Sequence, residues 1–563
     1  MTEAGDWFRG SQVSYVSQSV FHCLMAAVRA FVSRLLLLPA LGLLCSSPCV
    51  SGGKVLIWPG EYSHWLNMKT IVEELSQRGH KITVITHSAT PTVSNSSLAP
   101  GNYRFEILQV SFTRQEVQQN VDEMLKYWTY DMHNDNLIQA SLRVKAIMDT
   151  GIGNNQEVCK ALFSDTELLE RLRNDRYDVL LSDPMMNAGG ELLAEILGLP
   201  FILSMRFSFG NTMERLCGQL PSPPSFVPGI GFEYTDKMTF AQRLKNILFC
   251  ISQDIVFKII SVWKWDGFFT EVLGTPTTFC EILGKADIWL IRTYWDFEYP
   301  RPFLPNFKFV GGLHCKPAKP LTEALEEFVQ SSGDDGIVVF SLGSMVKNLT
   351  KERGNTIASA LGQIPQKVLW RYTGEKPETL APNTRVYDWI PQNDLLGHPK
   401  TKAFITHGGT NGLYEAIYHG VPVVGLPLFG DQPDNIMHMT TKGAAVMVDF
   451  NKMTSQDLVD GLNSVINDPL YKENMMRLSR IHHDQPMKPL DTAVFWIEFV
   501  MRHKGAKHLR VESHNLSWYQ YHCLDVAAAL LSVVLLITVV TVKICTFCIR
   551  KCFRKTKVRQ KTD

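Results

Sequence analysis

The run from Trp389 to Gln432 constrains the fold of this 563-residue chain more than any other stretch. An apolar β-type segment, Ala403 to Thr406, ends at His407-Gly408-Gly409, and a helical pattern from Asn411 to His419 follows at once. This order predicts a strand, a tight turn and a helix. Glycines at such a turn let a ligand approach the backbone, and the free amides and positive dipole end of a helix bind anions. The run therefore predicts a phosphate or diphosphate site.

A second buried strand is predicted just beyond that helix, at Val423 to Leu426. Asp431 and Gln432 follow its end, which is where open parallel sheets bind ligands. Other strand-like runs alternate with helical patterns along the chain: Lys54 to Trp58, Lys81 to Thr86, Tyr177 to Ser182, Phe201 to Ser204, Ile337 to Ser341, Lys367 to Tyr372 and Thr384 to Tyr387. Such alternation predicts an α/β protein with parallel, doubly wound sheets.

The length of the chain exceeds what one hydrophobic core fills, so two large domains with appendages are expected. Prolines concentrate at Tyr299 to Pro305 and at Lys316 to Pro320, which indicates a hinge between domains. The expected parts are a leader and signal peptide (1–52), a first α/β domain (53–298), a hinge and domain start (299–320), a second α/β domain (321–488), a closing helix with a juxtamembrane segment (489–524), a transmembrane helix (525–543) and a basic tail (544–563).

The two ends of the chain predict a membrane protein. Leu35 to Leu44 is an apolar run between arginines and small residues, as in a cleavable signal peptide, for which Met25 is a more usual start than Met1. Val526 to Val542 with its flanks supplies the ~20 residues that a bilayer crossing needs. Basic residues follow it, so the positive-inside rule places the tail in the cytoplasm and the bulk of the chain in the lumen. A buried core helix is the alternative, and the length and asymmetric flanks of the run disfavour it.

Short motifs point to the endoplasmic reticulum. Arg559 and Lys561 are the fifth and third residues from the end and resemble a basic retrieval signal. Sequons begin at Asn95, Asn348 and Asn515, all on the predicted lumenal side, and we expect one or two of them to be glycosylated. The chain is therefore predicted to be a type I, single-pass protein of the endoplasmic reticulum membrane.

Two long stretches, Arg114 to Leu168 and Ser208 to Phe269, interrupt the first domain and are expected to be irregular insertions that shape a binding cleft. Within the second, Asn246 to Phe269 is apolar with few charges. Core packing explains it most plainly; contact with the lumenal leaflet or the lining of an apolar substrate channel are alternatives.

The lumenal cysteines show no metal-ligand or redox spacing, so they are interpreted as buried small apolar residues. They are Cys159, Cys217, Cys250, Cys280, Cys315 and Cys523. A net charge of +1 gives no general attraction to nucleic acid. No Gly-x-Gly-x-x-Gly follows the first strand, which argues against an NAD-dependent enzyme.

Several motifs together resemble one enzyme family. The run from Trp389 to Gln432 resembles the signature of UDP-dependent glycosyltransferases, and the similarity extends from Lys54 to the tail. Phe309 to Cys315 (FVGGLHC), Phe340 to Ser344 (FSLGS) and Val494 to Val500 (VFWIEFV) look like the vertebrate UDP-glucuronosyltransferases of family 2. Ile291 to Phe297 (IRTYWDF) is more similar to the 2A-type branch.

The resemblance implies a GT-B fold, in which two Rossmann-like domains face a cleft, the first binding the acceptor and the second the UDP-sugar. It implies inverting transfer of glucuronic acid from UDP-glucuronic acid to a hydroxyl, carboxyl or amine of lipophilic acceptors such as steroids, phenols, odorants and xenobiotics. Homo- or hetero-oligomers with related transferases occur in the family. No cofactor or metal is expected, because the chain has no Asp-x-Asp motif and no His/Cys ligand cluster.

Site residues follow from the resemblance by position. Trp389 would stack on uracil, Gln392 would hold the nucleoside and Glu415 would accept hydrogen bonds from the ribose hydroxyls. The diphosphate would be surrounded by His407, Gly408, Asn411 and Gly412, with Ser341, Gly343 and Ser344 beside it. Asp431 and Gln432 would contact the sugar hydroxyls. Arg292 would support the diphosphate or the sugar carboxylate. A core role for Trp389 and a surface role for Arg292 are the alternatives.

The reaction also needs a general base, since the acceptor hydroxyl loses a proton as it attacks the anomeric carbon. A histidine suits this task at neutral pH. Of 16 histidines, His64 is best placed, in the loop expected after the first strand. Asp183 ends a neighbouring strand, and a carboxylate there would fix the imidazole tautomer and stabilise the imidazolium. The resemblance points to the same pair; the alternative is a plain surface histidine.

Two rival functions remain open at this point. One is the same fold moving another sugar, such as glucose or galactose. The other is a catalytically silent membrane protein that binds lipophilic ligands, against which the joint presence of His64, Asp183 and Asp431-Gln432 argues.

Overall fold

The computed structural model describes residues 52–559, apart from 186, 209–211 and 347–348. The signal peptide, both candidate start methionines, Asn348 and Lys561 therefore lie outside the described residues. The chain divides into two compact units at Gly53, and every element named below belongs to the second unit.

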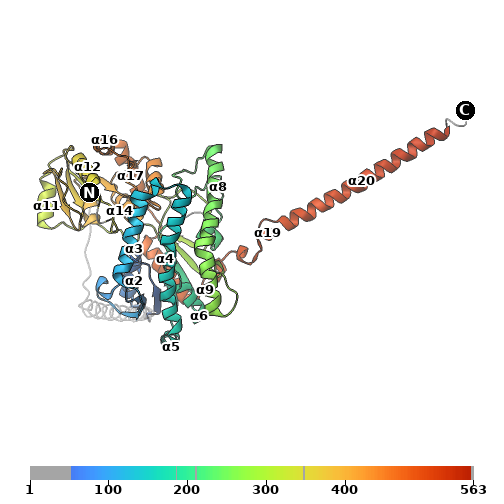
Figure 1. Ribbon diagram of the computed structural model, residues 1–563, viewed down its shortest axis with the longest axis horizontal. Coiled ribbons are helices and arrows are strands. Elements are labelled where there is room, and N and C mark those ends of the chain that lie inside the picture. Colours follow the sequence, from blue (N-terminus) through green and yellow to red (C-terminus); the bar gives the residue numbers. More distant parts are fainter. Residues whose placement is uncertain (1–51, 186, 209–211, 347–348, 560–563) are drawn as a thin grey trace, which may run out of the picture. The chain divides into compact units, whose positions relative to one another are not determined.

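Two parallel sheets form the framework of that unit (Figure 1). The first has the order β3 (Tyr103–Leu108), β2 (Lys81–His87), β1 (Lys54–Trp58), β4 (Val179–Ser182), β5 (Phe201–Met205), β6 (Ile288–Ile291) and β7 (Phe307–Phe309). The second has the order β10 (Thr384–Tyr387), β9 (Lys367–Arg371), β8 (Ile337–Ser341), β11 (Thr401–Thr406), β12 (Val423–Gly425) and β13 (Ala445–Met447). The predicted pair of doubly wound sheets is confirmed.

Both sheets reverse their strand order beside their first strand. In the first sheet β1 pairs with both β2 and β4, with Trp58 opposite Ser182; in the second β8 pairs with both β9 and β11, with Ser341 opposite Thr406. Loops that leave two such neighbouring strands run in opposite directions and open a crevice between them, which is where doubly wound sheets bind ligands. Each sheet thus offers one binding edge.

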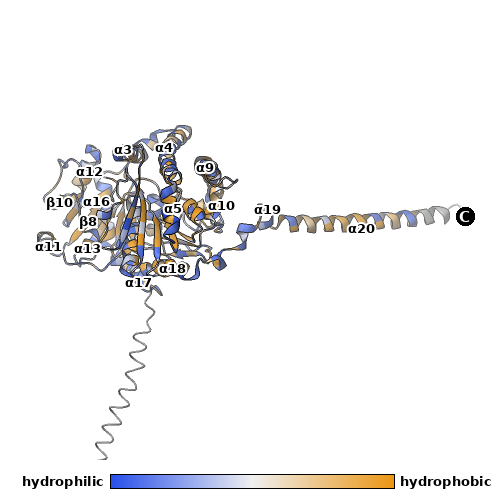
Figure 2. Ribbon diagram, turned by 90° about the horizontal axis from the view of Figure 1, so that it is seen from below, coloured by the Kyte–Doolittle hydropathy of each residue, from blue (hydrophilic) through white to orange (hydrophobic). Residues whose placement is uncertain are grey.

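Helices cover both faces of each sheet. Before β7 they are α2 (Ser63–Gln77), α3 (Arg114–Lys126), α4 (Leu137–Ser164), α5 (Thr166–Asn174), α6 (Gly190–Leu197), α7 (Met213–Leu216), α8 (Phe240–Phe257), α9 (Trp263–Leu273) and α10 (Phe279–Leu283). After it come α11 (Glu323–Gln330), α12 (Lys351–Leu361), α13 (Gln392–Leu396), α14 (Thr410–His419), α15 (Gln432–Thr441), α16 (Ser455–Asn467), α17 (Pro469–His483), α18 (Pro489–His503), α19 (Trp518–Tyr521) and α20 (Leu524–Arg559). Figure 2 shows apolar strands between helices whose outer faces are hydrophilic.

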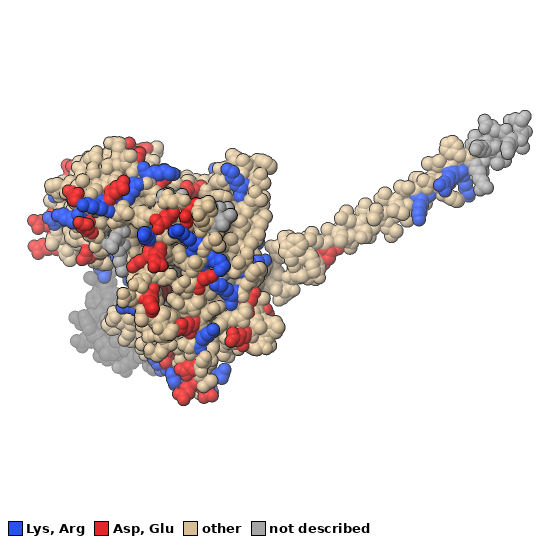
Figure 3. All heavy atoms as spheres, in the orientation of Figure 1, with Lys and Arg blue, Asp and Glu red and all other residues tan. Residues whose placement is uncertain are grey.

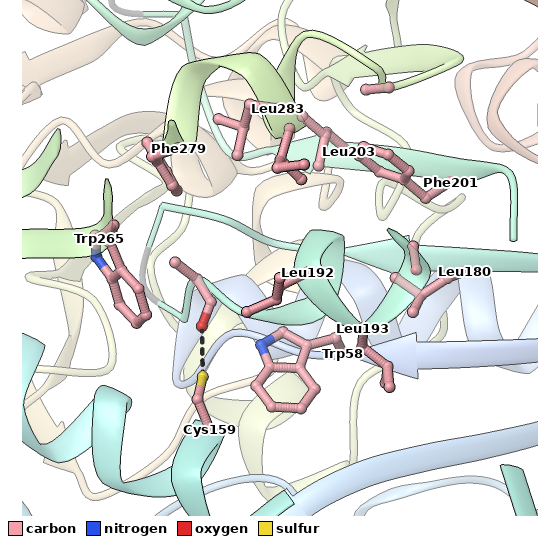
Figure 4. Packing of buried hydrophobic residues seen from close by; sticks show 14 of the residues in the cluster. Trp58, Cys159, Leu180, Leu192, Leu193, Phe201, Leu203, Trp265, Phe279 and Leu283 are labelled. Atoms are coloured by element: carbon pink, nitrogen blue, oxygen red, sulfur yellow. Dashed lines mark hydrogen bonds between the residues drawn. The ribbon is translucent and has the colours of Figure 1, made fainter. Parts of the chain in front are cut away.

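Alternation along β1 divides the first core into two layers, because successive side chains of a strand point to opposite faces. Leu56 and Trp58 join one layer with residues of α6, α9 and α10, and Figure 4 shows Trp58 together with Leu192, Trp265 and Phe279 of those helices. The indole Nε1 of Trp58 donates to Asn187 O at 2.7 Å. Val55 and Ile57 join the other layer, which α2 and α18 cover. The last long helix of the globular unit thus packs on the first sheet, although it follows the second in sequence.

The predicted irregular character of Arg114 to Leu168 and Ser208 to Phe269 is wrong. Helices α3, α4 and α5 occupy most of the first stretch, and α8, the π-helical turn η4 (Lys258–Val262) and α9 much of the second. Capping boxes start two of these helices, at Thr113 with Glu116 and at Thr239 with Gln242. Such caps satisfy the first free amides of a helix and are a local signal that the hydrophobic pattern alone did not reveal.

The cysteine interpretation also needs correction. Cys217 and Cys280 form a disulfide across 63 positions of sequence and join the end of α7 to α10. Of the other cysteines before the candidate membrane span, Cys159 is buried, Cys250 and Cys315 are partly buried, and Cys523 is exposed. The partners are far apart in sequence, so pairing became visible only once the fold had placed α7 beside α10.

Helix α20 carries one candidate membrane span, Leu524–Phe553, whose apolar side chains are exposed throughout. It is longer than the predicted range 525–543, because the helix continues into the basic residues. The globular unit leads to it through α18, two 3₁₀ turns (η5, Lys507–Leu509; η6, Glu512–Asn515) and the short α19. Asn95, in the 3₁₀ turn η1 (Asn95–Ser97), and Asn515 are both exposed. The domain limits given above stay predictions.

Candidate functional site

His64 and Asp183 meet at the binding edge of the first sheet. Asp183 directly follows β4, and its backbone amide donates to Trp58 O at 3.1 Å, which fixes it beside the end of β1. His64 Nδ1 lies 2.7 Å from Asp183 Oδ2, and both residues are buried. His64 is not in a loop as expected but in the first turn of α2, where Tyr62, at φ 53°, turns the chain into the helix.

Gly60 leaves the space in which this pair forms. A Cβ at Gly60 would lie 2.8 Å from His64 Cβ and 3.1 Å from Asp183 Oδ2, closer than a side chain tolerates. The Pro-Gly loop after β1 therefore brings backbone, imidazole and carboxylate together.

Burial and charge set the protonation of the pair. Burial lowers the pKa of His64 below its ordinary value of 6.5, with smaller contributions from Arg206 and Arg292 in the same direction, while Asp183 opposes the shift. Burial by itself would raise the pKa of Asp183, but His64 and Arg292 outweigh it and lower this pKa. At neutral pH the site thus holds a carboxylate and a neutral imidazole, which is the state of a general base.

Two arginines stand around the pair. Arg292 follows β6, and its Nη2 lies 3.9 Å from Asp183 Oδ2; both Nη atoms are buried without a hydrogen-bond partner, and burial lowers its pKa to about 9. This excludes a surface role for Arg292. Arg206 follows β5, and its Nη1 donates to Ser63 Oγ at 2.7 Å, while its Nε is buried and unpaired. Unsatisfied buried cations are costly, so they mark a place where an anion binds.

The turn after β11 forms the binding edge of the second sheet. Gly408 has φ 89° and Gly343 φ 79°, values that favour glycine. A Cβ at Gly343 would lie 2.6 Å from His407 Cε1, so the glycine makes room for the imidazole. Burial, helped by Arg206 and Arg371, lowers the pKa of His407 to about 3, which leaves a neutral ring that can donate a hydrogen bond.

Helix α14 begins at Thr410, so Asn411 and Gly412 lie in its first turn, where backbone amides have no partner within the helix. Ser341 ends β8, and its Oγ accepts from Gly343 N at 3.3 Å; Ser344 lies in the turn that follows. The structure thus brings the predicted diphosphate residues to one edge.

A hydrogen bond joins the two edges. Asn67 lies one helical turn after His64 on α2, and its Nδ2 donates to Asn411 Oδ1 at 2.8 Å and to Ser63 O at 2.9 Å. The helix that carries His64 is thereby fixed directly to the N-terminus of α14.

The predicted nucleoside residues lie farther along the second edge. Trp389 is 70% exposed, which excludes a core role and leaves its ring face free for stacking. Gln392 Nε2 donates to Glu415 Oε2 at 2.6 Å, and burial raises the pKa of Glu415 to about 7. His314 Nε2 lies 3.7 Å from the other carboxylate oxygen and 3.2 Å from Asn411 O, which links the nucleoside residues to α14.

Asp431 and Gln432 stand at the start of α15. Asn435 Nδ2 donates to Asp431 Oδ2 at 2.6 Å and to Gly408 O at 3.0 Å, which ties this helix to the diphosphate turn. Gln432 Oε1 accepts from Leu428 N and Phe429 N at 2.9 and 3.1 Å, so its amide nitrogen is the part that can reach a ligand.

A cavity lies beside these helices. Its walls come from the 226–230 loop, the 297–301 segment and α15, and Thr410 of α14 contributes to its lining. Aromatic and aliphatic side chains such as Phe226 and Phe297 line it together with about as many polar ones, including Asp434 and His438.

Sequence reasoning missed four residues of this arrangement: Gly60, Asn67, Arg206 and His314. Arg206 follows a predicted strand just as Asp183 does, so the same rule about strand ends would have found it. Asn67 is three positions after His64 and so on the same helix face, a signal that became usable once α2 was known to include His64. Among the described residues, no group of three or more His, Cys, Asp or Glu side chains is arranged to hold a metal ion.

The sequence is similar to that of known proteins over most of its length. A family model described as UDP-glucoronosyl and UDP-glucosyl transferase matches residues 53–559. UDP-glucuronosyltransferase 2B15 of Homo sapiens is 56% identical over 511 residues, 91% of this chain and 96% of that protein. UDP-glucuronosyltransferase 2A2 of Homo sapiens is also 56% identical, over 89% of this chain and 93% of that protein, so both branches of family 2 match.

Solved structures show the same fold at low sequence identity. The glycotransferase of kitacinnamycin matches with a TM-score of 0.54 and 18% identity over 80% of this chain and 98% of its own. Os79 from O. sativa, solved in complex with U2F and trichothecene, matches with a TM-score of 0.53 and 16% identity over 79% of this chain and 100% of its own.

Proposed function

Because this chain belongs to the family of UDP-glucuronosyl and UDP-glucosyl transferases, we propose that it transfers glucuronic acid from UDP-glucuronic acid to lipophilic acceptors. The observation that carries the choice of sugar is the 56% identity to named UDP-glucuronosyltransferases over nine-tenths of the chain. The buried His64–Asp183 pair supports catalysis rather than mere ligand binding, since a binder needs no such pair.

In the proposed mechanism His64 is the general base. Asp183 engages Nδ1 at 2.7 Å, so Nε2 is the nitrogen left to take the proton from the acceptor hydroxyl. The acceptor oxygen then forms a bond to the anomeric carbon of the sugar from the face opposite UDP. The bond from that carbon to the diphosphate breaks, and its electron pair leaves with UDP, so the configuration inverts. Asp183 stabilises the imidazolium as it forms.

The second edge would hold the donor. Trp389 would stack on uracil, while Gln392 and Glu415 would hold the nucleoside and its ribose. The amides at Asn411 and Gly412, together with the neutral imidazole of His407, would donate to the diphosphate, with Ser341, Gly343, Ser344 and Gly408 shaping its turn. Asp431 and Gln432 would reach the sugar hydroxyls.

Arg292 and Arg206 would supply the positive charge that the leaving diphosphate and the sugar carboxylate require. Their unpaired nitrogens face no other partner among the described residues, which supports this assignment. We propose transfer without a metal, with these groups carrying the charge instead. The cavity beside Thr410 is the proposed acceptor site, since it adjoins both edges and its lining includes aromatic side chains such as Phe226 and Phe297.

The test uses the full-length chain in membranes, supplied with lipophilic acceptors and separately with UDP-glucuronic acid, UDP-glucose and UDP-galactose. Glucuronide formation is expected with the first donor. Transfer from UDP-glucose but not from UDP-glucuronic acid would overturn the sugar assignment, and no transfer from any donor would favour a silent binder.

The role of His64 is tested in parallel. His64→Ala should abolish transfer to hydroxyl acceptors while UDP still protects the protein from thermal unfolding. His80→Gln is the matched control, because that buried histidine precedes β2 at the opposite edge of the same sheet. Near-normal turnover of His64→Ala would remove this residue from the mechanism.

We also propose a type I orientation in the endoplasmic reticulum membrane, with both sheets in the lumen and the tail in the cytoplasm. The exposed Asn95 and Asn515 and the span in α20 support this topology. Sealed microsomes should protect the globular unit from protease, and glycosidase should reduce its apparent mass. Association with a second copy or a related transferase is proposed from the family and is measurable by co-purification of two tagged forms.

A further inference from the structure

Helix α8, η4 and the start of α9 carry one continuous stripe of exposed apolar side chains. Apart from the adjacent pair Ile247 and Leu248, successive members lie three or four positions apart, and all are between 40% and 74% exposed: Phe240, Leu244, Ile247, Leu248, Ile251, Ile255, Ile259 and Trp263. This spacing puts them on one helical face. The 24 positions from Phe240 to Trp263 span ~36 Å of helix. Soluble surfaces rarely leave so long an apolar patch uncovered, so the stripe indicates a contact surface.

The helix that carries the stripe is fixed to the rest of the protein through its opposite face. The buried Asn246 donates through Nδ2 to Pro224 O and Val227 O, at 2.8 and 3.0 Å, and accepts from Gly229 N at 2.8 Å. Farther along, Trp265 and Phe269 lie in the core of the first domain. One face of this segment is therefore fixed while the opposite face is left open. The expected core packing of Asn246 to Phe269 is confirmed for Trp265, Phe268 and Phe269 but not for exposed side chains such as Leu248, Ile255 and Trp263.

The charges around the stripe have one sign. Lys245 and Lys258 are exposed beside it, whereas the sole acid between Phe240 and Trp263, Asp254, pairs with Arg215. Figure 3 shows α8 as a column with few charged side chains. An apolar helix face flanked by lysines is the composition of helices that lie in the interfacial region of a bilayer.

The segment between the globular unit and the membrane span is short, which keeps the α9–α10 side of the protein near the membrane. His514 lies against Gly284, just after α10: a Cβ on Gly284 would be 2.9 Å from its Nδ1. Helix α10 packs beside α9, with the Phe279 ring 5.8 Å from that of Phe269. The span starts at Leu524, only ten residues after His514. Ten residues reach at most ~35 Å when fully extended, so the α9–α10 side cannot lie farther than that from the bilayer.

We propose that the stripe from Phe240 to Trp263 lies in the lumenal headgroup region of the bilayer and forms a second membrane contact of the chain, in addition to α20. The inner face of the same helix holds the loop from Pro224 to Gly229, part of which lines the cavity. The contact therefore brings the cavity wall next to the leaflet in which lipophilic acceptors dissolve. That consequence rests on the proposed function, whereas the membrane contact itself does not.

The test compares two leucines of equal exposure in the full-length chain, reconstituted at one copy per nanodisc of phosphatidylcholine and phosphatidylserine. Leu248 is 60% exposed on the stripe, and Leu470 is 59% exposed on α17. Leu248→Cys and Leu470→Cys are treated with a charged maleimide, and each site is read by the mass of its peptide. Leu248→Cys should react at least about tenfold more slowly, because a thiol among headgroups meets little aqueous reagent.

Equal reaction rates would overturn the proposal. Protection that appears only when two copies share a disc would overturn it too, since a second copy would then cover the stripe. An independent experiment uses brominated lipids, which quench tryptophan fluorescence on contact. Trp263→Phe should lose part of the quenching that the unmodified chain shows. An unchanged extent of quenching would contradict the membrane contact. Labelling and quenching need no turnover, so their failure is distinguishable from failure of the proposed function.

Discussion

Replacing Asp183 with asparagine tests the electrostatic part of the mechanism most directly. The change removes one negative charge and keeps the size of the side chain. Because His64 is neutral before transfer and positive in the transition state, the carboxylate stabilises the transition state more than the ground state. Both side chains are buried, at 8% and 1% exposure, so water screens this interaction little.

The expected magnitude follows from the geometry. The 2.7 Å contact between Nδ1 and Oδ2 places the two charge centres ~4 Å apart, and at an effective dielectric constant of about 20 their attraction is ~4 kcal/mol. Since 1.36 kcal/mol corresponds to a factor of ten, kcat should fall by about 10³. Arg292 lies 3.9 Å from the same carboxylate and loses its counter-charge, which opposes the imidazolium further.

The assay measures initial rates at saturating UDP-glucuronic acid with a hydroxyl acceptor, and protection by UDP against thermal unfolding checks the donor site. Asp491→Asn is the control, because that carboxylate pairs with Arg78 at the surface and its loss should change kcat by less than about twofold. A decrease in kcat of less than about tenfold, with UDP binding intact, would refute the assigned role. A merely structural role would lower the rate equally at every pH, whereas loss of this charge moves the acid limb of the profile to lower pH.

Three further outcomes are expected. Burial lowers the pKa of His64 below 6.5, so its base form persists in mildly acidic solution. In a pH profile, kcat/KM should therefore be retained at pH 6.5 and fall only below that pH. A profile whose acid limb has its midpoint above pH 6.5 would contradict this. Asn67→Ala breaks the 2.8 Å bond to Asn411 that joins the two edges, and should lower kcat/KM about fivefold, the equivalent of ~1 kcal/mol, without loss of thermal stability beyond that amount. Gly343→Ala places a Cβ 2.6 Å from His407 Cε1 at a φ of 79°, so the affinity for UDP, measured by calorimetry, should fall at least about tenfold.

Controls for the last two variants are residues outside the site. Thr70→Ala is on the exposed face of α2, where its Oγ1 bonds only Leu66 O, and should leave kcat/KM unchanged. Gly151→Ala on α4 has no heavy atom within 4 Å of the new Cβ and should leave UDP affinity unchanged. If either control behaved like its partner, the effect would be a general one on the fold.

The strands were the most predictable part of this protein. Lys54–Trp58 and Ile337–Ser341 match the predicted ranges, because a strand buried on both faces is a continuous apolar run bounded by turn residues. Thr384–Tyr387 also matches, although it is an edge strand in which only Thr384 is buried. The helical insertions were not predictable in this way. In α8 the usual amphipathic pattern is inverted: the exposed face is apolar, whereas the inner face carries the polar Asn246 and Gln253, which bond the loop behind it.

The parts of the candidate site were predictable only within each sheet. The rule that ligands bind beyond the ends of parallel strands selects His64 and Asp183 in one sheet and the His407 turn in the other. It does not specify how the two sheets meet. The contact between Asn67 and Asn411 joins positions 344 apart and depends on that placement.

Arg292 and Arg206 show why this placement would matter for the proposed catalysis. A buried charge costs several kcal/mol unless it is paired, and the buried Arg292 and the partly buried Arg206 together leave three guanidinium nitrogens without a hydrogen-bond partner. The Asp183 carboxylate, 3.9 Å from Arg292 Nη2, is already engaged by His64. The fold therefore keeps an excess of positive charge at the junction of the two edges, which the proposed anionic donor would neutralise on binding. Positive charge that is held in place before binding needs no reorganisation during the reaction. Charge held in this way would stabilise a leaving diphosphate best.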